Sequence, residues 1–337
     1  MTARATRLWL IALVGAAVLG ACSGARSPEG GDDGALSVVT TVSPITSLAE
    51  NIAGTRANVT GIVPEGANSH TFEPRPAVAR TLANADLVFV NGLQLEEPTL
   101  RLAEANRTPD TQVVALGDLV VSPEQWVFDF SFPASGGRPN PHLWLDPVLA
   151  KAYARIIAER MAARDPANAT YYLENLARLE GRLERLDQAT RAAVSTVPPG
   201  NRRLLTYHDS WPYWARRYGF EVIGAVQPAD FAEPSPREVA ALIEQVRAAK
   251  VPAVFGSEVF PSAVLETIAR EAGARFIDEL RDDDLPGEPG DAGHSYLGLM
   301  RTNMEVLVTA LGGSADALRD IDVRPVFEGR SRTTYPQ

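Results

Sequence analysis

The chain has 337 residues, of which 45% are hydrophobic, and this length suits two folded lobes rather than one. Its formal net charge is −10 at pH 7, and no basic face stands out, so nucleic acid is excluded as an expected partner. The single cysteine, Cys22, excludes intrachain disulfides and cysteine-rich metal sites.

The N-terminal segment has the pattern of a secretory signal. Arg4 and Arg7 precede an apolar run that is too short for a comfortable membrane span. The run ends in Leu-Gly-Ala directly before Cys22, which resembles a bacterial lipobox; an ordinary signal peptide with a chance cysteine is the alternative. We predict a lipoprotein signal peptide over residues 1–21, acylation of Cys22 (palmitate), and a flexible glycine-rich tether over residues 22–35.

Short apolar runs then alternate with helical patterns. Strands are predicted at residues 36–42, 57–63, 86–92 and 112–116, and at 203–208, 220–226, 252–256 and 274–280. Ser43-Pro44 opens a helix that runs to about Ala53, and a capping box at Ser235 starts one that runs to about Ala249. Nearly continuous apolar strands separated by helices indicate parallel sheets covered on both faces.

One helix pattern is exceptionally long. From about Asn168 to Val194 the leucines form a single apolar stripe, with charged residues opposite. We interpret this helix as a rigid connector between two α/β lobes; a short coiled coil is the alternative. The predicted fold class is therefore α/β, with two lobes of parallel sheet and flanking helices. The N-terminal lobe covers residues 36–165, the connecting helix 166–197 and the C-terminal lobe 198–337.

At least two of three histidines, His70, His142 and His208, are placed where a ligand of an α/β sheet binds. His70 follows the second predicted strand, His142 precedes a helix, and His208 ends a strand. Ligands of open α/β sheets bind outside the carboxyl ends of the strands. Three imidazoles and one carboxylate would complete a tetrahedral zinc shell, with Asp278 or Glu258 as the carboxylate. The spacing matches no zinc-finger or His-Glu-x-x-His pattern, so the residues alone leave the site open.

Six segments, in order, carry a resemblance to a known family. They are PEGANSHTFEPRP, ADLVFVNGLQLE, NPHLWLDP, TYHDSWPYWARRYGF, VFGSEVFPSAVLETIAREAG and SYLGLMRTNMEVL. Over about residues 36–311 the chain resembles the metal-binding solute-binding proteins of zinc and manganese ABC importers. The resemblance implies two lobes joined by one long helix, with the metal between them.

Motif by motif, the resemblance places the metal ligands at His70, His142, His208 and Asp278. A histidine as third ligand resembles the zinc-type members, because manganese-type members often have glutamate there. Glu258 is then a residue that orients a histidine, or the rival fourth ligand. Many zinc-type members also carry a histidine-rich loop before the second ligand, whereas residues 117–141 contain no histidine.

The expected function is that of an extracytoplasmic carrier, not an enzyme. The chain would capture Zn²⁺ as its transported ligand and deliver it to a cognate ABC permease, with a metallochaperone as a further candidate partner. We expect a monomer that is lipid-anchored to the cell membrane, in the periplasm or at the cell surface. Manganese is the alternative cargo. A zinc hydrolase is the alternative class, although four protein ligands would close the metal shell against a catalytic water.

Two further groups are expected to have structural roles only. His294 stands next to Ser295 at a predicted helix start, which favours a structural or capping role. The acidic run over residues 282–284 is expected to be a solvated loop surface.

Overall fold

The computed structural model of the chain describes residues 34–227, 232–259 and 263–336. Cys22, the predicted signal peptide and nearly all of the predicted tether lie outside the described residues. Each of the eight strands predicted from the sequence forms. They belong to two separate parallel sheets, as the apolar pattern predicts.

The first sheet is built mainly from the N-terminal lobe. Its strand order is β4-β3-β1-β2-β9, and all of its pairs are parallel. The strands are β1 (Leu36–Thr40), β2 (Ala57–Gly61), β3 (Leu87–Val90), β4 (Gln112–Ala115) and β9 (Thr333–Thr334). Strand β3 is buried along its whole length, as expected for a central strand covered on both faces.

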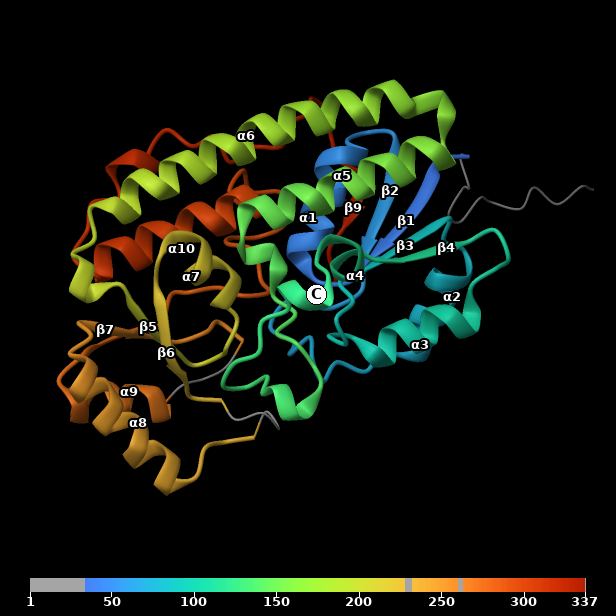
Figure 1. Cartoon of the computed structure of the whole chain (residues 1–337). Coiled ribbons are helices and arrows are strands. Elements are labelled where there is room, and N and C mark those ends of the chain that lie inside the picture. Colours follow the sequence, from blue (N-terminus) through green and yellow to red (C-terminus); the bar gives the residue numbers. More distant parts are fainter. Residues whose placement is uncertain (1–33, 228–231, 260–262, 337) are drawn as a thin grey trace, which may run out of the picture. The chain divides into compact units, whose positions relative to one another are not determined.

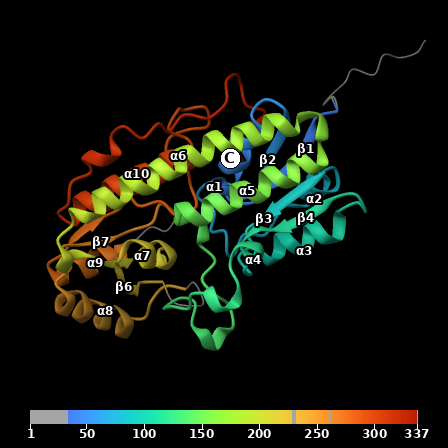
Figure 2. The ribbon, with the colours of Figure 1, turned by 45° about the horizontal axis from the view of Figure 1, so that its top comes forward.

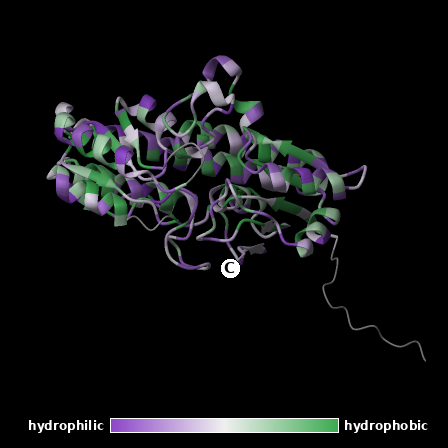
Figure 3. Ribbon diagram, turned by 90° about the horizontal axis from the view of Figure 1, so that it is seen from below, coloured by the Kyte–Doolittle hydropathy of each residue, from purple (hydrophilic) through white to green (hydrophobic). Residues whose placement is uncertain are grey.

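The second sheet belongs to the C-terminal lobe. Its order is β6-β5-β7-β8, again with parallel pairs only. The strands are β5 (Arg203–Thr206), β6 (Glu221–Ala225), β7 (Ala253–Phe255) and β8 (Arg275–Ile277). Figure 3 shows that hydrophobic residues line the strands of both sheets, whereas the helices carry both kinds of residue.

Helices separate the strands along the chain. They are α1 (Ser43–Ala53), α2 (Pro76–Ala83), α3 (Glu97–Asn106), α4 (Leu116–Val120), α5 (Pro147–Arg164), α6 (Ala169–Ser195), α7 (Pro212–Tyr218), α8 (Pro236–Ala249), α9 (Ala263–Ala272) and α10 (Tyr296–Ala310). The capping box at the start of α8 is confirmed, since Ser235 and Glu238 bond to each other's backbone N–H groups.

Helix α6 is the long helix that the leucine stripe predicts. It runs alongside α5 and continues to the second sheet (Figures 1 and 2). Leu179, Leu183 and Leu186 of the stripe are buried, whereas Leu173 at its N-terminal end is 46% exposed. The buried leucines belong to one apolar cluster that includes residues of both lobes. The connecting helix is therefore packed against both lobes and is not a free-standing rod.

The C-terminal tail returns to the first sheet. Strand β9 pairs with β2 through Val59 and Thr60, and the backbone N–H of Val326 donates to the side chain of Asn51. This segment lies within residues 198–337, which we assigned to the C-terminal lobe from the sequence, but β9 and Val326 contact the N-terminal lobe. Two residues in extended form give no recognisable pattern, so the sequence did not indicate this strand.

No helix among the described residues combines the length and the apolar character that crossing a membrane requires.

Candidate metal centre

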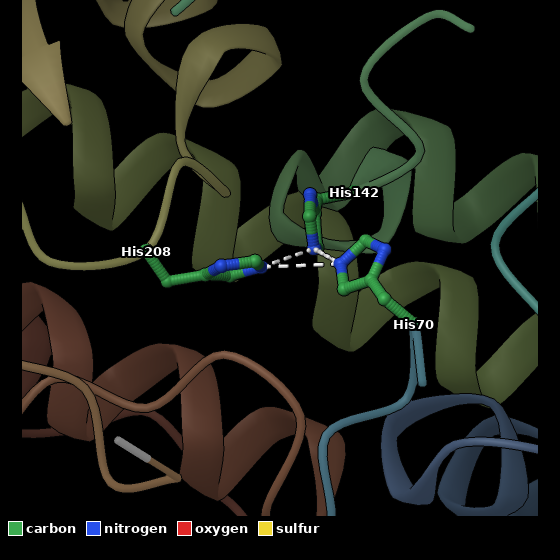
Figure 4. Close-up of side chains that lie close together, drawn as sticks. All are labelled: His70, His142 and His208. Atoms are coloured by element: carbon green, nitrogen blue, oxygen red, sulfur yellow. Dashed lines mark hydrogen bonds between the residues drawn. The ribbon is translucent and has the colours of Figure 1, made fainter. Parts of the chain in front are cut away.

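Three histidines from three different segments converge at one point (Figure 4). His70 lies in the turn segment after β2, and His208 follows the end of β5. His142 comes directly before a short 3₁₀ turn, Leu143–Leu145, that leads into α5. Two of the rings therefore come from the N-terminal lobe and one from the C-terminal lobe.

The three rings present their Nε2 atoms to one another. The Nε2–Nε2 distances are 3.2 Å between His70 and His142, 3.2 Å between His70 and His208, and 2.9 Å between His142 and His208. Tetrahedral zinc with Zn–N bonds of about 2.0–2.1 Å places its nitrogens about 3.3 Å apart. The three nitrogens thus have nearly the spacing of three corners of one metal shell.

A hydrogen bond at the other ring nitrogen of His142 fixes the orientation of that ring and the position of its proton. Its Nδ1 lies 2.8 Å from Oδ1 of Asn140. The amide Nδ2 of Asn140 donates to Oδ2 of Asp129 and to the backbone carbonyl of Asp209, so its oxygen must face the ring. The proton of neutral His142 is therefore on Nδ1, and Nε2 directs a lone pair at the cluster.

His208 is held in the same way. Its Nδ1 lies 2.6 Å from Oε1 of Gln227, an acceptor that places the ring proton on Nδ1.

Burial lowers the pKa of His142 and of His70 well below the usual value for histidine, and the neighbouring imidazoles lower it further. Both rings are therefore neutral at pH 7, which is the state that binds a metal.

The segment over residues 117–141 packs against the site and hydrogen-bonds to residues of the C-terminal lobe. The Phe132 ring lies 5.5 Å from that of His70 and 5.8 Å from that of His142, measured between centroids. The backbone N–H of Ser131 donates to Asp209, and its hydroxyl donates to the carbonyl of Gln227. Beside His70 a small cavity of about 70 Å³ is lined by Phe132, Arg138 and other residues of this loop.

Asp278, the fourth ligand that the sequence predicts, does not lie with the histidines. Its side chain is exposed just after β8. Partial burial raises its pKa, and the carboxylates of Glu266 and Glu279 raise it further. No carboxylate among the described residues joins the group of ligand atoms that lie within 4.8 Å of one another. Asp278 therefore stays a prediction from the sequence that the structure does not bring to the histidines, since the chain continues past Asp278 before it turns toward them.

The acidic run at Asp282–Asp284 is not the solvated surface that we expected. The three residues are 3%, 6% and 7% exposed. The cause is Glu258, whose Oε1 accepts from the backbone N–H groups of all three, at 2.8, 3.1 and 3.0 Å. Glu258 therefore orients this loop, whereas the sequence suggested that it orients a histidine.

The three acidic side chains make different hydrogen bonds. Asp282 accepts from the hydroxyls of Ser210 and Ser257, and Asp284 accepts from a backbone N–H. Asp283 accepts from the hydroxyl of Ser69 at 2.7 Å, and Ser69 directly precedes His70. Its other oxygen, Oδ1, is buried and has no hydrogen-bond partner among the described residues. Burial raises the pKa of Asp283 to about 8.

The fold and the cluster together define a class of protein. Two α/β lobes joined by a long helix, with histidines of both lobes meeting at one point, are the architecture of a metal-binding solute-binding protein. Residues 38–310 match the family described as zinc-uptake complex component A, periplasmic, and the chain belongs to this family. It is thus a substrate-binding component of a metal ABC importer and not an enzyme.

Relatives and solved structures agree with this assignment. The chain is 30% identical to the manganese-binding lipoprotein MntA of Halalkalibacterium halodurans, over 88% of this chain and 95% of that protein. It is 28% identical to the metal ABC transporter substrate-binding lipoprotein FimA of Streptococcus parasanguinis, over 90% of this chain and 97% of that protein. The periplasmic zinc-binding protein TroA of Treponema pallidum superposes with a TM-score of 0.73 at 26% identity, over 81% of this chain and 98% of TroA.

Gln227 should matter for metal affinity although it is not itself a candidate ligand. Gln227→Ala removes the acceptor that holds the His208 proton on Nδ1, so we expect zinc affinity to fall about 10- to 100-fold. Gln188→Ala, at an exposed position of α6, is the matched control and should leave affinity unchanged. Chelator competition measures both, and equal affinities in the two variants would contradict the role given to Gln227.

Proposed function

We propose that this chain captures Zn²⁺ outside the cytoplasmic membrane and delivers it to an ABC permease. The observation that carries the proposal is the set of three Nε2 atoms at 2.9–3.2 Å, contributed by His70, His142 and His208. At least two of these atoms direct lone pairs at the common centre, because Asn140 and Gln227 occupy the other ring nitrogens. Such a group needs a cation between the nitrogens.

We further propose Asp283, in place of Asp278, as the fourth ligand. Support comes from its buried Oδ1, which lacks a hydrogen-bond partner, and from its bond to Ser69 beside His70. A shift of the carboxylate toward the histidines would complete a tetrahedron of three nitrogens and one oxygen. With four protein ligands the shell has no open position for a catalytic water, which agrees with a carrier rather than a hydrolase.

The two aspartates provide a direct test of the fourth ligand. Asp283→Ala should reduce zinc affinity by more than the roughly 10- to 100-fold loss typical of a residue that only orients a ligand. Asp278→Ala should bind zinc like the wild type, because its carboxylate is exposed and apart from the histidines. Titration against a competing chelator compares the variants, and a greater loss in Asp278→Ala would restore the original assignment.

The cargo is proposed to be zinc, with manganese as the alternative. Relatives named for manganese and structures named for zinc both match this chain. Three neutral imidazoles and one carboxylate form a softer ligand set than Mn²⁺ prefers, and Mn²⁺ is lowest in the general affinity order for divalent metals. The ligand chemistry therefore favours zinc.

A competition experiment decides between the two cations. The metal-free chain is incubated with Zn²⁺ and Mn²⁺ at equal concentrations, and the bound metal is measured after removal of the free ions. We expect zinc in nearly every loaded molecule. Retention of manganese under these conditions would overturn the zinc assignment, while binding of neither ion would overturn the proposed function itself.

We also propose that Cys22 is acylated and that the lipid anchors the chain beside its permease. Relatives named as lipoproteins and the Leu-Gly-Ala-Cys sequence support this proposal. Mass spectrometry of the membrane fraction should detect a lipid adduct on Cys22, and Cys22→Ala should move the protein to the soluble fraction. An unmodified Cys22 in membrane-bound protein would contradict it.

The working form is proposed to be a monomer, with a metallochaperone as a further candidate partner.

A further inference from the structure

A second cluster of metal-binding side chains surrounds His294. The ring of His294 packs edge-on against that of Tyr335, with centroids 4.7 Å apart. The hydroxyl of Tyr335 donates to Oε2 of Glu50 at 2.7 Å, and Nε2 of His294 lies 3.6 Å from Oε1 of Glu65. One imidazole and two carboxylates thus lie around the C-terminal tail, more widely spaced than the three histidines, whose ligand atoms all lie within 4.8 Å of one another.

His294 is buried without the hydrogen bonds that a buried imidazole normally makes. Its side chain is 1% exposed, and neither ring nitrogen makes a regular hydrogen bond among the described residues, although the backbone carbonyls of Gly287 and Pro286 lie near the ring. Leaving such nitrogens without full hydrogen bonds is costly, so a cation bound to the ring would stabilise this arrangement. The neighbouring Ser295 caps α10, and so His294 is not needed as the cap that the sequence suggested.

The cluster borders a cavity large enough for an ion with its waters. This cavity, of about 450 Å³, lies between the C-terminal tail and the loop before α10. Glu50, Asp291, His294 and Tyr335 all contribute to its lining. Burial lowers the pKa of His294, and nearby carboxylates and carbonyls offset this only in part, so the ring is neutral at pH 7. A neutral imidazole beside carboxylates suits a divalent transition metal.

We propose that His294 and Glu65, with Glu50 as a third ligand, form a second binding site for a divalent cation such as Zn²⁺. The 3.6 Å between Nε2 of His294 and Oε1 of Glu65 is close to the separation of about 3.3 Å between two ligands of one zinc ion. This site binds more weakly than the three-histidine centre, because Glu50 must exchange its bond to Tyr335 for the metal.

The location gives the second cation a structural consequence. Glu65 also accepts from the backbone N–H of Leu285 and lies in the segment that leads to His70. A cation on Glu65 and His294 would link that segment to the loop carrying Asp283. Occupation of the second site therefore stiffens two of the segments that build the first.

The four histidines of the chain make the test direct. The full mature chain is titrated with Zn²⁺ alone, while the side-chain nitrogen resonances of the histidines are followed by NMR. We expect the first equivalent to shift His70, His142 and His208, and the second to shift His294. If the first equivalent shifts none of these three, the proposed function fails; if His294 does not respond to further zinc, the second site fails.

Substitutions assign the second equivalent to its ligands. His294→Asn and Glu65→Gln should each lower the affinity for the second zinc at least tenfold and retain the first, and the retained first site shows that the variant is folded. His142→Ala should show the reverse pattern. Glu288→Gln, an exposed acid of the same loop, is the control. Binding of the second zinc at wild-type strength in both His294→Asn and Glu65→Gln would overturn the proposal.

Discussion

The meeting of three imidazole nitrogens at about 3 Å is the constraint on which the rest of the site depends. Asn140 and Gln227 hold the protons of His142 and His208 on Nδ1, so two lone pairs face each other across 2.9 Å. Such an arrangement is unfavourable by itself and becomes favourable when a cation lies between the nitrogens. The surrounding structure must therefore hold the rings in place before the metal arrives, which is the usual task of residues that contact metal ligands.

The hydrogen bonds that hold the histidines in place connect the two lobes. Asn140 bonds to Asp209, the neighbour of His208, and Ser131 bonds to both Asp209 and Gln227. The segment over residues 117–141 thus belongs to the N-terminal lobe by sequence but supports a ligand of the C-terminal lobe. In place of metal-gathering histidines it contributes Phe132, whose ring packs on the rings of His70 and His142.

The sequence located the strands and the three histidines that converge, whereas the carboxylate that it placed with them, Asp278, lies apart from them in the structure. Apolar runs and strand ends are local signals, and they located both sheets, the long helix and three residues that do converge. The path of the chain after β8 depends on Glu258, a residue distant in sequence that draws the backbone of Asp282–Asp284 into the interior. Without that contact an acidic run is indistinguishable from a solvated loop, so Asp278, nearer the strand end, was the expected ligand.

The packing also limits how a metal could be released. One apolar cluster includes buried residues of both lobes and of the helix that joins them, such as Leu48, Leu183 and Met300. A wide separation of the lobes would expose this cluster to water, at a cost that grows with the apolar area exposed. The contacts around the three histidines are different in kind, because Phe132 and Asp283 are carried by loops that hydrogen bonds hold in place. We therefore expect these loops to rearrange when the metal leaves while the shared core stays packed, so that release is a local event.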